Sequence, residues 1–276
     1  MAYLRTRLGR WFYEEGGVDA SGGKPGEPTI VLLHSLLCDS GMWKGQMGPL
    51  RALGRVVAID GPGHGRSEVA PPFSLEDHAS AVIEAFDQIH IDRALIAGLS
   101  WGGMLGMRVA LSHPKRLAGM VLLDTSADGT LFRERLEYRA MCALALRIGL
   151  PPAMVKKKIV PLMFSEATRT NKPELVLEFE RSLGGFPIEG VTRAVAAVSI
   201  DRPSILERIR EIRVPTLVGY GEEDVATPAE HSRRIASRIA GTILVPFEGV
   251  GHLSALEDPA LVNESVLPFV KDHLRA

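Results

Sequence analysis

Six short apolar runs constrain the fold of this chain more than any other feature of its sequence. Their hydrophobicity is continuous rather than alternating, which is typical of strands buried on both faces of a parallel sheet. Segments with helical spacing of apolar residues separate them, so the sequence predicts a doubly wound, mostly parallel α/β sheet. The six runs are Thr29–Leu33, Val56–Ile59, Ala94–Ala97, Met120–Leu123, Thr216–Val218 and Ile243–Val245.

Local signals mark where several other elements begin and end. Residues 1–15 are interpreted as a hairpin that turns at Gly9, and the glycine-rich segment Gly16–Pro28 as a loop. Ser74–Asp77 resembles a capping box that starts a helix. A last helix is expected to begin at Asp258-Pro259, and Pro268 inside it predicts a kink or a break.

One connection is too long for an ordinary crossover. About ninety residues separate Leu123 from Val214, whereas a strand–helix–strand unit needs only ~30. Apolar residues recur in this insert at roughly helical spacing, so we predict a helical cap over one edge of the sheet. The predicted organisation is an α/β core of residues 1–126 and 213–276, with the cap formed by residues 127–212.

Charge and cysteine content exclude several classes of protein. Lys and Arg number 32 against 33 Asp and Glu, and this balance argues against a nucleic-acid partner. No run reaches the ~18 apolar residues of a membrane-spanning helix, and Met1–Arg10 lacks the apolar core of a signal peptide. With only Cys38 and Cys142, a disulfide framework is not expected. We therefore expect a cytoplasmic protein with no membrane partner, and its oligomeric state stays open.

The pentapeptide Gly98-Leu99-Ser100-Trp101-Gly102 follows the third apolar run and opens a helical pattern. This is the context of a nucleophile elbow, a sharp strand-to-helix turn that exposes the central serine. The glycines are needed because a Cβ at either position would collide with a neighbouring strand or helix. Ser100 is therefore the candidate nucleophile, and the N-terminus of its helix favours a developing negative charge.

A serine hydroxyl needs a base to remove its proton. His252 follows the last apolar run, and Asp224 follows the run that starts at Thr216. The chain order of serine, acid and histidine matches the α/β-hydrolase layout. We assign His252 as the base and Asp224 as the acid that orients it.

Three further carboxylates compete with Asp224 for that role. Glu222 and Glu223 share its loop, and Asp124, the main rival, follows the Met120 run. Thr227–Glu230 is interpreted as a capping box with proline at the first helical position, which leaves Asp224 in the preceding loop. An oxyanion hole is also expected, formed by the backbone N–H groups of Leu36 and Trp101.

Taken together, five ordered motifs resemble the α/β-hydrolase superfamily over nearly the whole chain. They are His34-Ser35-Leu36 with Trp43, Asp60–Ser67, Gly98–Gly103, Gly221-x-x-Asp224-x-x-x-Pro228, and Gly251-His252. Within the superfamily, residues 34–127 are similar to 3-oxoadipate enol-lactonases and related small esterases. The resemblance implies a structural role for His64 and places Trp43 near the mouth of the pocket.

The cap departs from the lactonase pattern. Where those enzymes have Ile-Gly-Thr followed by Trp and Arg, this chain has Asp128-Gly129-Thr130 followed by Phe132, Arg133 and Arg135. Phe132 and Arg133 are candidate substrate-binding residues. Either an arginine here binds a substrate carboxylate, or these arginines belong to the surface of a cap helix.

The expected reaction is hydrolysis of a small-molecule carboxylic ester or lactone through an acyl-enzyme, with no metal and no organic cofactor. Dehalogenases and epoxide hydrolases of this fold attack with aspartate, so Ser100 argues against both. Three different functions stay open on the same residues: carbon–carbon bond hydrolysis with this triad, a cofactor-free haloperoxidase or perhydrolase, and a small-molecule receptor that does not turn over.

Overall fold

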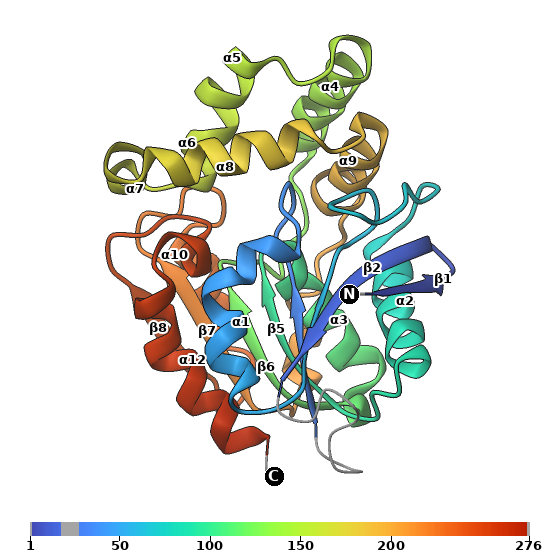
Figure 1. The fold of residues 1–276 in the computed structure, drawn as a ribbon, viewed down its shortest axis with the longest axis vertical. Coiled ribbons are helices and arrows are strands. Elements are labelled where there is room, and N and C mark those ends of the chain that lie inside the picture. The colour runs from blue at the N-terminus through green and yellow to red at the C-terminus, as the bar shows by residue number, and fades with distance from the viewer. Residues whose placement is uncertain (1, 18–27, 275–276) are drawn as a thin grey trace.

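The computed structural model describes residues 2–17 and 28–274, and Figure 1 shows its fold. In this part of the chain eight strands form one sheet in the order β1-β2-β4-β3-β5-β6-β7-β8. The strands from β3 to β8 pair in parallel, while the hairpin β1–β2 adds two antiparallel strands at one edge. The strands are β1 Ala2–Thr6, β2 Gly9–Gly16, β3 Thr29–Leu33, β4 Val56–Ile59, β5 Ala94–Leu99, β6 Leu117–Leu123, β7 Thr216–Gly221 and β8 Ile243–Phe247.

All six predicted apolar runs are strands, and the predicted hairpin is also present. One detail differs, because β8 lies at the edge of the sheet rather than within it. Ile243 is 51% exposed and Leu244 38% exposed, whereas all residues of β3 to β7 are buried. The loop predicted over Gly16–Pro28 falls almost wholly outside the described residues.

Helices cover both faces of the sheet and bury two apolar clusters against it. On one face, α1 Lys44–Arg51 packs with α12 Pro259–His273 and α11 Ser254–Glu257. On the other, α2 Leu75–Gln88 packs with α3 Trp101–Ser112, and α10 Ala229–Ala236 joins the same cluster. Shorter 3-10 turns are η1 Ser40–Trp43, η2 Pro114–Arg116 and η5 Arg208–Glu211. The two covered faces are the expected layers of a doubly wound fold.

Two predicted helix starts are confirmed, whereas a predicted break inside a helix is absent. Ser74 and Asp77 form the predicted capping box of α2, and the Asp258 side chain caps α12 at Leu261. Pro268, however, does not break α12, which runs continuously to His273. The proline removes one backbone donor, and the packing of Val266 and Phe269 in the core holds the helix together around it.

The segment between β6 and β7 contains helices and no strand. Figure 1 shows α4 to α9 gathered beyond the end of the sheet. The helices are α4 Phe132–Ile148, α5 Pro152–Met154, α6 Val160–Met163, α7 Glu166–Asn171, α8 Pro173–Gly184 and α9 Ile188–Val195, with π-helical turns η3 Val155–Ile159 and η4 Ala196–Ile200. This is the predicted helical cap, inserted between strands. In the described part of the chain, no helix has the length and apolar character needed to cross a membrane.

Residues 124–131 and residues 201–207 join the cap to the core. These two hinge segments are hydrogen bonded to each other. The N–H of Ile205 donates to the carbonyl of Ala127 over 2.9 Å, and the N–H of Thr130 donates to the carbonyl of Arg202 over 3.4 Å. The cap also contacts the core at Gly190 and Gly63. An added Cβ on Gly63 would lie 2.5 Å from the Cα of Gly190, so the two backbones touch directly.

Candidate active site

Ser100 occupies a strained turn between β5 and α3. Its φ of 52° and ψ of −107° are rare for a residue with a side chain. The turn is tight because a Cβ on Gly98 would lie 2.3 Å from the carbonyl carbon of Gly102, and a Cβ on Gly102 would lie 2.1 Å from the carbonyl oxygen of Leu33. Both glycines are therefore required, and this is the geometry expected of a nucleophile elbow.

Asp224 and His252 form a buried, hydrogen-bonded pair. The Nδ1 atom of His252 lies 2.9 Å from Oδ2 of Asp224, and both residues are buried. The other oxygen of Asp224, Oδ1, accepts the backbone N–H groups of Ala226 at 2.8 Å and Thr227 at 2.9 Å. The carboxylate thus has a fixed orientation, and it in turn fixes the ring of His252.

Asp224 and His252 each stabilise the charged form of the other. Burial alone would raise the pKa of Asp224, but the ion pair and hydrogen bond with His252, with hydrogen bonds from Thr227, hold that pKa below its ordinary value. Burial acts to lower the pKa of His252, and the carboxylate of Asp224 outweighs it, so the pKa of His252 is raised. The pair therefore favours a charged imidazolium, the species that forms when a histidine accepts a serine proton.

Thr227 contributes to this pair in a way that the sequence did not indicate. Its hydroxyl does not cap α10, whose N-cap is Pro228 without a side-chain hydrogen bond. The predicted capping box is therefore wrong. Thr227 Oγ1 instead lies 2.7 Å from Oδ2 of Asp224 and 2.9 Å from the carbonyl oxygen of Asp124, either of which can accept its one proton, and it lies 3.3 Å from Nδ1 of His252. A hydroxyl next to a buried carboxylate makes a stronger bond there than at a helix end.

Asp124, the main rival for the role of the acid, lies beside the pair but has other partners. Its Oδ1 accepts the N–H of Gly221 at 2.7 Å, and its Oδ2 accepts the hydroxyl of Ser254 at 2.5 Å. Burial, together with the negative charge of Asp224, raises the pKa of Asp124 well above its ordinary value. Asp124 thus links the end of β6 to the end of β7 and to the start of α11. Glu222 and Glu223, which precede Asp224 in its loop, have exposed side chains.

The loop after β3 carries the first predicted oxyanion donor, Leu36. Two buried histidines hold this loop: His64 Nε2 accepts the N–H of Leu37 at 3.3 Å, and His34 Nε2 accepts the N–H of Gly61 at 2.7 Å. Burial lowers the pKa of His64 to about 3, so its ring stays neutral and can accept. The structural role expected of His64 agrees with these contacts, and His34 makes a contact of the same kind.

The second predicted donor is the backbone N–H of Trp101, at the first position of α3, where a helix leaves its N–H groups without internal partners. Among the described residues, neither this N–H nor that of Leu36 donates to a protein acceptor. Both donors are thus available to a ligand.

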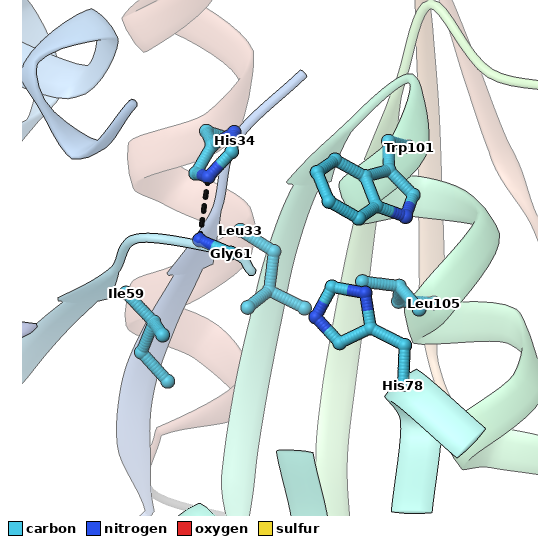
Figure 2. A pocket seen from close by; sticks show the side chains of 7 residues that line it. All are labelled: Leu33, His34, Ile59, Gly61, His78, Trp101 and Leu105. Carbon is cyan, nitrogen blue, oxygen red and sulfur yellow. Dashed lines mark hydrogen bonds between the residues drawn. The ribbon is translucent and has the colours of Figure 1, made fainter. Parts of the chain in front are cut away.

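A small cavity lies beneath the ring of Trp101, with space for roughly one water molecule. Figure 2 shows that His34, His78 and Trp101 surround it, and that His34 bonds Gly61 at its margin. Burial holds the pKa of His78 well below its ordinary value. Neither Ser100, Asp224 nor His252 lines this cavity, so we interpret it as a gap in the packing behind the elbow. The lining residues are Leu33, His34, Ile59, Gly61, His78, Trp101 and Leu105.

The three predicted substrate-binding residues have different surroundings. Trp43 is buried at 1% exposure in the core on the α1 face of the sheet. Phe132 is 75% exposed at the start of α4, and the side chain of Arg133, 90% exposed, pairs with Glu137 one turn further on at 3.0 Å. Among the described contacts, none joins these residues to Ser100 or His252, and their role in binding stays a prediction. Within the same part of the chain, no group of three or more His, Cys, Asp or Glu side chains is arranged to hold a metal ion.

Comparison with known proteins agrees with this geometry. Residues 30–265 match the model of the alpha/beta hydrolase family. The chain belongs to the α/β-hydrolase family. It is 30% identical, over 99% of its length and 69% of the relative's, to a protein of Pseudomonas putida named dihydrolipoyllysine-residue acetyltransferase component of acetoin cleaving system.

Two solved α/β-hydrolase structures are close to this fold. A thermophilic esterase from Thermogutta terrifontis, solved with malate bound, superposes with a TM-score of 0.89 at 25% identity, covering 99% of this chain and all of the other. The enol-lactonase from Burkholderia xenovorans LB400 superposes with a TM-score of 0.88 at 27% identity, covering 98% and 99%. The predicted membership of the α/β-hydrolase family is therefore confirmed, and an enol-lactonase is among the similar structures.

Proposed function

We propose that this protein is a serine hydrolase that cleaves a carboxylic ester or lactone through an acyl-enzyme. The observation that carries the proposal is the buried Asp224–His252 pair on loops after β7 and β8, at the same edge of the sheet as the strained Ser100 after β5. The carboxyl ends of parallel strands form the usual ligand crevice of such a sheet. The esterase and the enol-lactonase among its structural neighbours support the substrate class.

The proposed reaction begins when the hydroxyl of Ser100 attacks the ester carbonyl and His252 takes its proton. Asp224, with its position fixed by Thr227, stabilises the imidazolium. The N–H groups of Leu36 and Trp101 hold the oxyanion. His252 then protonates the leaving alkoxide, which gives the acyl-enzyme, and the same histidine activates the water that releases the acid.

The test is hydrolysis of p-nitrophenyl butyrate, followed past many equivalents, with wild type and Ser100→Ala compared. We expect multiple turnovers for the wild type and a loss of roughly 10³-fold or more in the variant, because the nucleophile is gone. Turnover retained in a folded Ser100→Ala variant would contradict the assignment of the nucleophile. A single equivalent of product followed by arrest would favour a receptor instead.

A further inference from the structure

Most of the exposed large apolar side chains of the described structure lie on the cap. There are thirteen such side chains, and eight of them fall within residues 131–162. Helix α4 carries most of these eight, because Ala145 is its only buried residue. Near the end of this helix, Leu144, Leu146 and Ile148 are 48%, 55% and 58% exposed. Single exposed apolar side chains are ordinary, but a group of them on one element indicates an interaction site.

The same part of the cap carries positive charge and no negative charge. Residues 141–158, which we call the cap tip, contain Arg147, Lys156, Lys157 and Lys158 but neither aspartate nor glutamate. The whole chain, by contrast, has a net charge of −1. All four cationic side chains are exposed, and within the described residues none of them forms an ion pair. The cap tip is therefore a surface that attracts anions.

The lysines of the cap tip lie near the exposed apolar end of α4. A connection of three residues joins α4 to α5, so the Cα atoms of Ile148 and Pro152 are at most ~14 Å apart. Residues 156–158 follow in the π-helical turn η3, whose end residues Val155 and Ile159 are buried in the cap. The three lysines between them are exposed to solvent. Figure 1 shows α4 and α5 at the end of the molecule that is farthest from the sheet.

Charge decides which kind of partner fits the cap tip. A second copy of this chain would bring four more cations and no acid to a shared interface, and like charges oppose that pairing. A bilayer with anionic lipids offers negative headgroups above an apolar interior, and each lysine or arginine near it strengthens binding. Leucine and isoleucine side chains of the same surface can enter the boundary of the acyl chains, while the cations stay at the headgroups.

The placement of the apolar residues on α4 also suits a fluid surface. Leu144 and Leu146 are two positions apart, which places them on opposite flanks of the helix. A groove on a folded protein holds one apolar face of a helix and would leave the other flank in water. Fluid acyl chains can contact both flanks at once.

We propose that the cap tip binds an anionic lipid bilayer, with its cations at the headgroups and the end of α4 in the outer part of the acyl layer. The expectation of no membrane partner rests on the absence of a spanning segment from the sequence, and the described structure has no spanning helix. A helix that lies on a bilayer needs none. The proposal concerns a surface of the cap and does not depend on the reaction at Ser100.

The test is co-sedimentation of the whole protein with vesicles of phosphatidylcholine, either alone or mixed with an equal amount of phosphatidylglycerol. Wild type should bind the mixed vesicles and bind phosphatidylcholine alone at least about tenfold more weakly. Raising NaCl from about 50 mM to about 500 mM should weaken binding to the mixed vesicles by a similar factor, because salt screens the headgroup charge. Failure of the wild type to bind the mixed vesicles at low salt would overturn the proposal.

A charge variant and its control locate the cations that bind. The variant Lys156→Gln/Lys157→Gln/Lys158→Gln should weaken binding to the mixed vesicles roughly 100-fold, since each charge near the surface contributes about fivefold. The control makes the same change in net charge at three exposed cations outside the cap, and it should weaken binding less than about threefold. The control variant is Arg5→Gln/Lys115→Gln/Lys271→Gln.

An apolar variant tests insertion without changing any charge. Leu146→Ser/Ile148→Ser should weaken binding to the mixed vesicles at least about tenfold, because two side chains no longer leave water. The control Ile243→Ser/Leu244→Ser removes two exposed apolar side chains from β8 and should bind as the wild type does. Thermal midpoints of all four variants check that they are folded.

Two further results would overturn the proposal. Equal losses in each variant and its control would show a general attraction between protein and lipid rather than a site at the cap tip. Sedimentation equilibrium tests the alternative occupant. A wild-type dimer that Leu146→Ser/Ile148→Ser dissociates, together with no binding to vesicles, would assign the cap tip to a second copy of the chain.

Discussion

The backbone strain at Ser100 gives a prediction that separates function from stability. A φ of 52° with a ψ of −107° suits glycine and costs on the order of 1–3 kcal/mol for other residues. Both Ser100→Gly and Ser100→Ala should be inactive, since neither has a nucleophile. Ser100→Gly should nevertheless be the more stable, by roughly 1 kcal/mol, because it relieves the strain that alanine retains. Urea denaturation of the two variants measures the difference, and equal stability would show that the turn stores no strain.

Substitution by asparagine should abolish most activity at Asp224 and leave activity largely intact at Asp124. Asp224→Asn should lower kcat by about 10³–10⁴-fold, because the amide cannot stabilise the imidazolium of His252. Asp124→Asn should stay active, since its amide can accept from Gly221 and donate to a rotated Ser254 hydroxyl. Steady-state kinetics decide between them, and a large loss in Asp124→Asn alone would reassign the acid.

The difference in folding stability between Asp124→Asn and the wild type should depend on pH. The pKa of Asp124 is raised in the folded state, so above its ordinary value of 3.8 the unfolded chain loses a proton that the folded chain keeps. This difference reduces the stability of the wild type as pH rises, until the pH passes the folded pKa. Asparagine removes the effect, so the advantage of the variant should grow between pH 4 and neutral pH in denaturation experiments. A constant difference across that range would contradict a raised pKa.

The pH dependence of turnover follows from His252. Catalysis requires the neutral ring as base, and the carboxylate of Asp224 raises the pKa of His252 above its ordinary value of 6.5. For the wild type, kcat/KM should therefore fall as the pH is lowered, with a midpoint above pH 6.5. A midpoint well below that value would mean that the ring is not paired with an ionised Asp224 in the free enzyme.

At the scale of elements, the approach of α3 to β3 depends on Gly102. A Cβ there would lie 2.1 Å from the carbonyl oxygen of Leu33, which is backbone and cannot move aside. Gly102→Ala should destabilise the fold by roughly 1–3 kcal/mol and lower activity by displacing Ser100. The matched control is Gly184→Ala at the end of α8, where nothing lies within 4 Å of an added Cβ and stability should change by less than about 0.5 kcal/mol. Denaturation midpoints of the pair test the contact.

The order of elements could be predicted from sequence because apolar runs and glycine-rich turns act locally. Six strands, the elbow at Ser100 and the Asp224–His252 pair follow from such signals. Thr227 could not be predicted, since a threonine before proline fits a helix cap as well as a bond to a carboxylate, and only the packed loops decide.

At the scale of the whole molecule, one buried side chain connects the cap to the loop that carries His252, the proposed base. Glu257 accepts the N–H of Gly251 at 2.9 Å with one oxygen and the N–H of Ser165, in the cap, at 3.0 Å with the other. Its backbone carbonyl accepts from Lys172, a second cap residue, at 2.7 Å. A shift of the cap would therefore be transmitted to the residue next to His252.

Glu257→Gln should loosen this connection, because glutamine offers one acceptor oxygen where two N–H groups need acceptors. The unmatched group is buried, so we expect a loss of about 1–3 kcal/mol in the free energy of unfolding. A small displacement of His252 should also lower kcat by roughly 10-fold to 100-fold while KM changes little. Glu264→Gln, on the exposed face of α12, is the control and should leave both quantities unchanged. If Glu257→Gln lowers stability but leaves kcat intact, the cap is anchored through Glu257 without governing the position of the histidine.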